Sequence, residues 1–130
     1  MQVNSYRDLE VWQWVRVIAK GAYLLTKVYP KEELFGMTSQ IRRAAASIPA
    51  NIAEGWGRHF PAEFIQFLRT ANGSRTELET HLIVSADVGL CTEPSIQPLL
   101  EELSILGKQL LNLERSLKQR LQRGRMASSE

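Results

Sequence analysis

The chain has 130 residues, of which 44% are hydrophobic and 23% are charged, and its formal net charge is +2. These values are typical of one globular domain with its own core, and they exclude a low-complexity or disordered chain. The single cysteine, Cys91, excludes an internal disulfide. No apolar run is long enough to span a membrane and the first residues are too polar for a secretory signal, so we expect a cytoplasmic protein.

Charge is distributed unevenly along the chain. Residues 76–107 contain six carboxylates and no lysine or arginine, whereas residues 108–125 contain six cations and one glutamate. Blocks of this kind can steer charged partners. They can equally compensate one another between neighbouring antiparallel helices, and the sequence leaves both interpretations open.

The first predicted helix covers residues 8–29. Apolar side chains recur within it at steps of four and three, as in a helix that packs one face against a core. These side chains are Val11, Val15, Ile18, Ala22, Leu25 and Tyr29. Pro30 follows, and we expect it to end the helix because proline lacks a backbone donor.

The second predicted helix covers residues 38–56, with Thr38 as its N-cap. Its apolar positions are Ile41, Ala45, Ile48 and Ile52. Pro49 falls inside this pattern, so we expect a kink there rather than an end.

Two longer helices are predicted over residues 61–89 and 95–121. The first begins at Pro61, a residue type favoured in the first helical turn, and ends at Gly89. The second carries leucine at every third or fourth position, which is the clearest helical pattern in the chain. Residues 123–130 lack an apolar period, and we expect them to be a disordered tail.

Four amphipathic helices with short connections predict an all-α fold, an antiparallel up-and-down four-helix bundle formed by residues 1–122. The internal prolines argue against one long coiled coil. A helical solenoid would need an internal repeat of about 30–45 residues, and the sequence has none.

Polar residues form a second stripe along each of the two middle helices. Their spacing places them on one helical face, beside the apolar positions. Polar groups at a core edge need partners, so we expect them to hydrogen-bond across the helix pair and fix its register. The expected pairs are Arg43 with Glu77, and Asn51 or Glu54 with Ser74 or Arg75. The network residues are Gln40, Arg43, Ser47, Asn51, Glu54, Ser74, Glu77 and His81.

A basic surface on the same helices is a candidate for RNA phosphates. Its arginines are Arg42, Arg43, Arg58, Arg69 and Arg75. Trp56, His59 and Phe60 lie between them in the sequence, and aromatic rings can stack on unpaired bases. A second basic run extends over residues 108–125.

The sequence contains no catalytic or metal-binding constellation. Its two histidines, His59 and His81, fit a solvated turn and the polar stripe, and there is no Glu-x-x-His pair or glycine-rich phosphate loop. Cys91 has no histidine or basic neighbour in sequence. We therefore expect no enzyme activity, no cofactor and no metal.

Large aromatic residues are more numerous than four thin helices can easily bury. They are Trp12, Trp14, Trp56, Phe60, Phe64 and Phe67. We expect some of them to face a second copy of the chain, since aromatic residues are enriched at interfaces. The alternative is that both N-terminal tryptophans fit into the core.

Several segments resemble a known protein family. They are Tyr6–Trp12, Gln40–Ala44, Ser47–Gly55, Ala71–Ser74 and Glu77–Thr80, and the block Ser-Ile-Pro-Ala-Asn-Ile-Ala-Glu-Gly is the most specific. Through these segments the chain resembles the bacterial four-helix-bundle proteins encoded in intervening sequences of 23S ribosomal RNA. The resemblance implies a homo-oligomer, a ring of five subunits as in the related accessory protein of diversity-generating retroelements. In that relative a basic surface binds nucleic acid and a reverse transcriptase, which implies RNA or a nucleoprotein as a partner here.

Two functions follow as expectations. The first is a non-enzymatic oligomeric module that binds structured RNA or a nucleoprotein through a basic surface. The second is a protein-binding scaffold with no nucleic-acid role, in which the acidic residues 76–107 meet a basic partner.

Overall fold

The computed structural model describes residues 2–129, with side chains described for residues 2–126. Within that range the chain forms helices and no strand, so the predicted all-α class is confirmed. The elements are η1 (Tyr6–Asp8), α1 (Glu10–Thr26), η2 (Lys31–Glu33), α2 (Met37–Gly57), α3 (Pro61–Asp87) and α4 (Glu93–Ser129).

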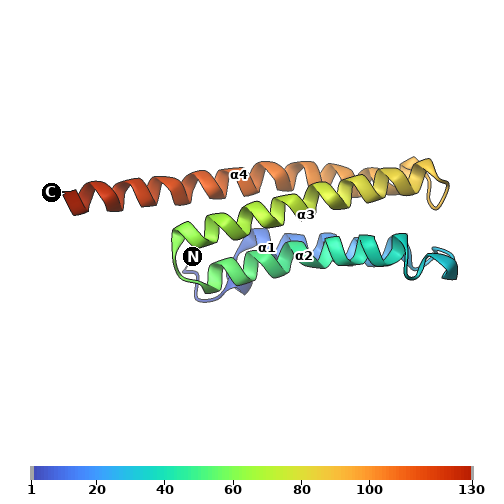
Figure 1. The fold of residues 1–130 in the computed structure, drawn as a ribbon, viewed down its shortest axis with the longest axis horizontal. Helices are drawn as coiled ribbons and strands as arrows, with labels where there is room; N and C mark the ends of the chain where they lie inside the picture. The colour runs from blue at the N-terminus through green and yellow to red at the C-terminus, as the bar shows by residue number, and fades with distance from the viewer. Residues whose placement is uncertain (1, 130) are drawn as a thin grey trace.

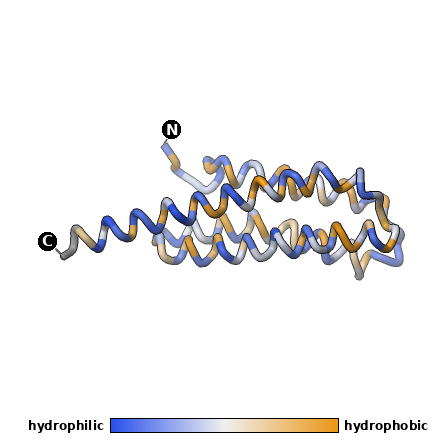
Figure 2. The backbone as a smooth tube through the Cα atoms, turned by 90° about the horizontal axis from the view of Figure 1, so that it is seen from above, coloured by the Kyte–Doolittle hydropathy of each residue, from blue (hydrophilic) through white to orange (hydrophobic). Residues whose placement is uncertain are grey.

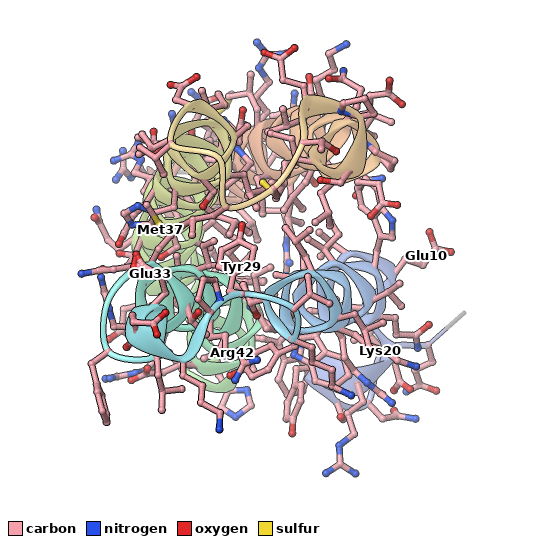
Figure 3. The ribbon with its side chains drawn as sticks, turned by 90° about the vertical axis from the view of Figure 1, so that its right-hand side faces the viewer. Glu10, Lys20, Tyr29, Glu33, Met37 and Arg42 are labelled. Carbon is pink, nitrogen blue, oxygen red and sulfur yellow. The ribbon has the colours of Figure 1, made fainter. Side chains whose placement is uncertain are left out.

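The four α-helices run up and down along one axis and form an elongated bundle (Figure 1). Each helix packs against the next one in the chain, and α4 also packs against α1. The end view shows α1 and α2 in one layer and α3 and α4 in the other (Figure 3). This arrangement is the up-and-down four-helix bundle that the periodicity predicts.

The core uses the predicted apolar positions. Val15, Ile18 and Ala22 of α1 are at most 1% exposed, and Ile41, Ile48 and Ile52 of α2 are equally buried. The buried leucines of α4 are Leu99, Leu103, Leu106, Leu110 and Leu117. Leu113 and Leu121, which continue the same pattern, are partly exposed. Apolar positions become sparse toward the C-terminal end of α4 (Figure 2), so that end contributes little to the core.

Two helix ends differ in detail from the prediction. Helix α1 ends at Thr26, before Pro30, where the amides of Lys27 and Tyr29 donate to the carbonyl oxygens three residues earlier and no longer four. Helix α3 ends at Asp87, two residues before Gly89, whose φ of 83° is easily adopted by glycine. The amide of Leu90 then donates to the Ser85 carbonyl oxygen and closes the end of the helix.

The start of α2 is a correction to the prediction. Thr38 is not the N-cap, because the helix begins at Met37 after Gly36 and Thr38 lies buried in the first turn. The helix then continues through Pro49 without a break, since a proline removes only one backbone donor from the ladder.

The prediction of a disordered tail over residues 123–130 is wrong for the residues that the structure describes. Helix α4 continues to Ser129, and Glu130 lies outside the described residues. The segment contains no proline and several good helix formers. Because the packed part of α4 already supplies the nucleus, the helix extends without further core contact.

Candidate nucleic-acid interface

The polar stripes of α2 and α3 meet in an ion pair across the two helices. Arg43 Nη2 lies 2.8 Å from Glu77 Oε1 and also donates to Gln40 Oε1 at 2.6 Å. His81 Nε2 lies 3.2 Å from the same Glu77 oxygen. The pairing of Arg43 with Glu77 is the one that the spacing predicts. Since the Arg43 side chain is 62% exposed, the ion pair contributes little stability.

One turn further along α2, small polar side chains connect the same helices. The hydroxyl oxygens of Ser47 and Ser74 are 2.8 Å apart, and Asn51 Nδ2 donates to the Ser47 carbonyl oxygen at 2.8 Å. Asn51 therefore reaches Ser74 through Ser47, and not by the direct contact that we expected. Glu54 pairs instead with Arg58, the residue that follows the last residue of α2, at 3.1 Å.

Arg42 lies at the contact between α1 and α2. Its Nε donates to Thr26 Oγ1 at 2.9 Å, and its guanidinium carbon lies 4.9 Å from the ring centre of Tyr23. Thr26 is only 2% exposed, so this hydrogen bond satisfies a buried hydroxyl. Arg42 thus links two helices through a hydrogen bond and a cation–π contact.

Arg75 fills a space between α3 and α4. It pairs with Glu79, and its Nε donates to Asn72 Oδ1 at 2.8 Å while its Nη1 donates to the Leu103 carbonyl oxygen of α4 at 3.4 Å. A Cβ at Gly107 would lie 2.8 Å from the guanidinium carbon. The missing side chain at position 107 is therefore what leaves room for the Arg75 guanidinium.

The other two candidate arginines pair with carboxylates at the bundle surface. Arg58 lies 3.1 Å from Glu54 and 4.0 Å from Glu63. Arg69 Nε donates to Glu114 Oε1 at 2.7 Å across α3 and α4, and this hydrogen bond lowers the pKa of Glu114. All five arginines that the sequence suggested for RNA thus have partners within the bundle, and a phosphate would compete with those partners.

A second set of cations lies outside these ion pairs. We call residues 115–129 of α4 the α4 extension; it follows Glu114 and contains no acidic residue. Beyond the buried Leu117 this part of the helix projects past the α2–α3 turn (Figures 1 and 2). Among the residues with described side chains, no carboxylate forms an ion pair with its four arginines. They are Arg115, Arg120, Arg123 and Arg125.

A pocket of about 330 Å³ opens where the α4 extension leaves the bundle. It lies between the N-terminal segment, the α2–α3 turn and α4, and most of its lining is apolar. The apolar side chains include Leu9, Trp56, Phe60, Phe64, Leu113 and Leu117. His59, Ser116 and Arg120 supply the polar groups. The sequence reasoning missed this pocket because its walls come from three separate segments.

The rest of the described chain offers no metal site and no membrane-spanning helix. No cluster of three or more His, Cys, Asp or Glu side chains within the described part of the chain is suited to a metal ion. None of the described helices has the length and apolar character needed to cross a bilayer. At the far end of the bundle, burial raises the pKa of Tyr29 to about 12, so its hydroxyl stays protonated.

These features define a helical-bundle protein whose candidate site is a charged surface beside an apolar pocket. Its sequence matches the family of 23S rRNA-intervening sequence proteins over residues 7–112. Since this match covers most of the chain, the protein belongs to that family, and the resemblance found in the sequence is confirmed. No curated protein matches the sequence. The matched range ends before the α4 extension begins.

Proposed function

We propose that the protein is a non-enzymatic, cytoplasmic module that binds a folded RNA or a nucleoprotein, and that it contacts the phosphates of the RNA. The observation that carries this proposal is the set of four arginines on the α4 extension that have no carboxylate partner among the described side chains. The association of the family with 23S rRNA, given by its name, supports RNA as the partner.

The α4 extension is long enough to contact several phosphates of one RNA strand. From residue 115 to residue 129 an α-helix spans about 21 Å at 1.5 Å per residue, so it passes several phosphates of an RNA strand. Arginines at successive turns can neutralise these phosphates and release the counterions that surround them. No rearrangement of the bundle is required, because the helix already projects from it (Figure 1).

The proposal is tested by the affinity of the purified protein for a folded RNA at increasing salt. Four phosphate contacts predict a log–log slope of about −3, at about −0.7 to −0.9 per contact. An affinity that stays constant between low and moderate salt, or the absence of binding at low salt, contradicts the proposal.

We further propose that the protein acts as a homo-oligomer. Large apolar side chains are exposed at the end of the bundle opposite the α4 extension, and a second copy of the chain would cover them. They include Leu24, Val28, Leu34, Phe35, Val84 and Val88. The ring of five implied by the resemblance is the expected assembly. A mass in solution equal to one subunit contradicts this part of the proposal.

A protein-binding scaffold is the alternative, and the charge of α3 and α4 supports it. Asp87, Glu93, Glu101 and Glu102 have no basic partner within ion-pair distance among the described side chains. These residues lie near the α3–α4 turn, where a basic partner would find a carboxylate surface. Binding of a basic partner protein that survives nuclease treatment, together with no affinity for RNA, would favour the scaffold.

A further inference from the structure

We propose that the pocket beside the α4 extension holds an unpaired base of the bound RNA, while Arg120 and Arg123 hold the neighbouring phosphates. The inference rests on the proposed function and goes further, because it names the kind of nucleotide that is bound and where its base lies.

The lining of the pocket suits a nucleobase better than a charged group. Trp56, Phe60 and Phe64 provide aromatic surface and the leucines of α4 provide aliphatic surface, so the flat face of a base would be covered by apolar atoms. Few polar groups are present, and those of His59 and Ser116 can hydrogen-bond to a base edge. The volume of about 330 Å³ lies at the small end of the range for ligand pockets.

The α2–α3 turn has an unusual backbone at this pocket. His59 has a φ of 65°, the left-handed conformation that residues other than glycine seldom adopt. It is held there by a hydrogen bond from its amide to the Trp56 carbonyl oxygen at 3.2 Å and by edge contact between the two rings. The turn leaves the Phe60 side chain 65% exposed. An exposed ring next to a strained turn is positioned to stack on a base.

The cations continue from the pocket along one face of α4. Ser116 and Arg120 line the pocket, and Arg123 follows at the spacing that keeps a side chain on the same helical face. Arg123 lies about 4.5 Å further along the axis, at 1.5 Å per residue. A base in the pocket would therefore place its sugar–phosphate backbone beside two guanidinium groups.

The apolar pocket and the arginines beside it together favour one kind of ligand. An apolar side chain from a second copy of the chain would use the pocket but not the arginines, and a phosphate alone would use the arginines but not the pocket. An unpaired nucleotide uses both, since it joins a stackable ring to an anionic backbone. The charge of the α4 extension thus favours RNA, and the pocket favours RNA with exposed bases over a fully paired duplex.

The test compares an unstructured single-stranded RNA with an RNA duplex that carries the same number of phosphates. The proteins are the unaltered chain, Phe60→Ala and Ile105→Ala. Ile105 is a control because it is an apolar side chain that is 51% exposed and lies on α4 before the α4 extension, outside the pocket and outside the proposed oligomer contact. We expect the unaltered chain to prefer the single strand, and Phe60→Ala to lose at least about fivefold of its affinity for the single strand. Ile105→Ala should keep this affinity, and neither variant should change binding to the duplex.

Each other outcome overturns the inference in a recognisable way. Equal affinity for both RNAs, unchanged by Phe60→Ala, shows a phosphate site without a base pocket and leaves the proposed function intact. A smaller mass in solution for Phe60→Ala shows that the pocket receives a second copy of the chain. Failure of the unaltered protein to bind either RNA removes the proposed function together with the inference.

Discussion

The arginines of α2 and α3 differ from those of the α4 extension in what surrounds them. The first group has protein partners, and Arg42 and Arg75 lie at contacts between helices. The second group lies on the α4 extension, which projects past the bundle beyond the buried Leu117, and has no carboxylate within ion-pair distance among the described side chains. The same residue type therefore stabilises the fold in one place and is available to a ligand in another, and sequence position alone does not distinguish the two.

The largest difference between the groups should appear in stability. Arg75→Ala removes the pairing with Glu79 and the link to the Leu103 carbonyl oxygen, so we expect a loss of about 1–3 kcal/mol in the free energy of unfolding. The matched variant Arg115→Ala, at an exposed position of α4, should change it by less than about 0.5 kcal/mol. Urea unfolding followed by circular dichroism measures both. Equal losses would contradict the assignment of Arg75 to the fold.

Alanine substitutions at Gly73 and Gly107 test more closely whether Arg75 stabilises the fold. Gly73 has open space around its Cβ position, so Gly73→Ala should stabilise α3 by about 1 kcal/mol through helix propensity. Gly107→Ala would push the Arg75 guanidinium away, and we expect it to be at least about 1 kcal/mol less stable than Gly73→Ala.

The same two glycine substitutions can be compared in a protein that already carries Arg75→Ala. In that protein Gly107→Ala should raise the free energy of unfolding as much as Gly73→Ala does, because the guanidinium that it would displace is absent. Unfolding of the double variants in urea measures this. An unchanged difference between the two glycines would show that contacts other than Arg75 restrict position 107.

The smallest effect concerns Glu114, which pairs with Arg69 on the bundle and borders the α4 extension. Its pKa is lowered in the folded protein by the hydrogen bond from Arg69, so its contribution to stability is present at neutral pH. That contribution is lost as the pH falls through the folded pKa, below the ordinary range of a glutamate. Glu114→Gln should therefore be less stable than the unaltered protein at neutral pH, and the difference should shrink in acid. Thermal unfolding at several pH values measures it, and a difference that grows in acid would contradict the pairing.

Much of the fold is predictable because apolar periodicity is a local property of the sequence. The steps of three and four residues locate four helices and also place Arg43 opposite Glu77. The position of Arg75 is not predictable in this way, since it depends on how closely α4 approaches α3 at Gly107. The last part of the α4 extension, residues 122–129, was not predicted as helix because the prediction ended the helix at residue 121, where its apolar pattern ends, whereas a nucleated helix continues through residues that merely favour it.

The most direct measurement compares two variants that each remove three positive charges. Arg120→Gln, Arg123→Gln and Arg125→Gln are combined in one protein, and Arg43→Gln, Arg58→Gln and Arg69→Gln in the other. The second set consists of surface arginines, so the bundle should remain folded. We predict that the first variant loses about tenfold or more in RNA affinity and that the log–log slope of its affinity against salt becomes shallower by about 2. In the second variant the affinity and the slope should both change much less. A larger loss in the second variant would contradict the division between structural and available arginines.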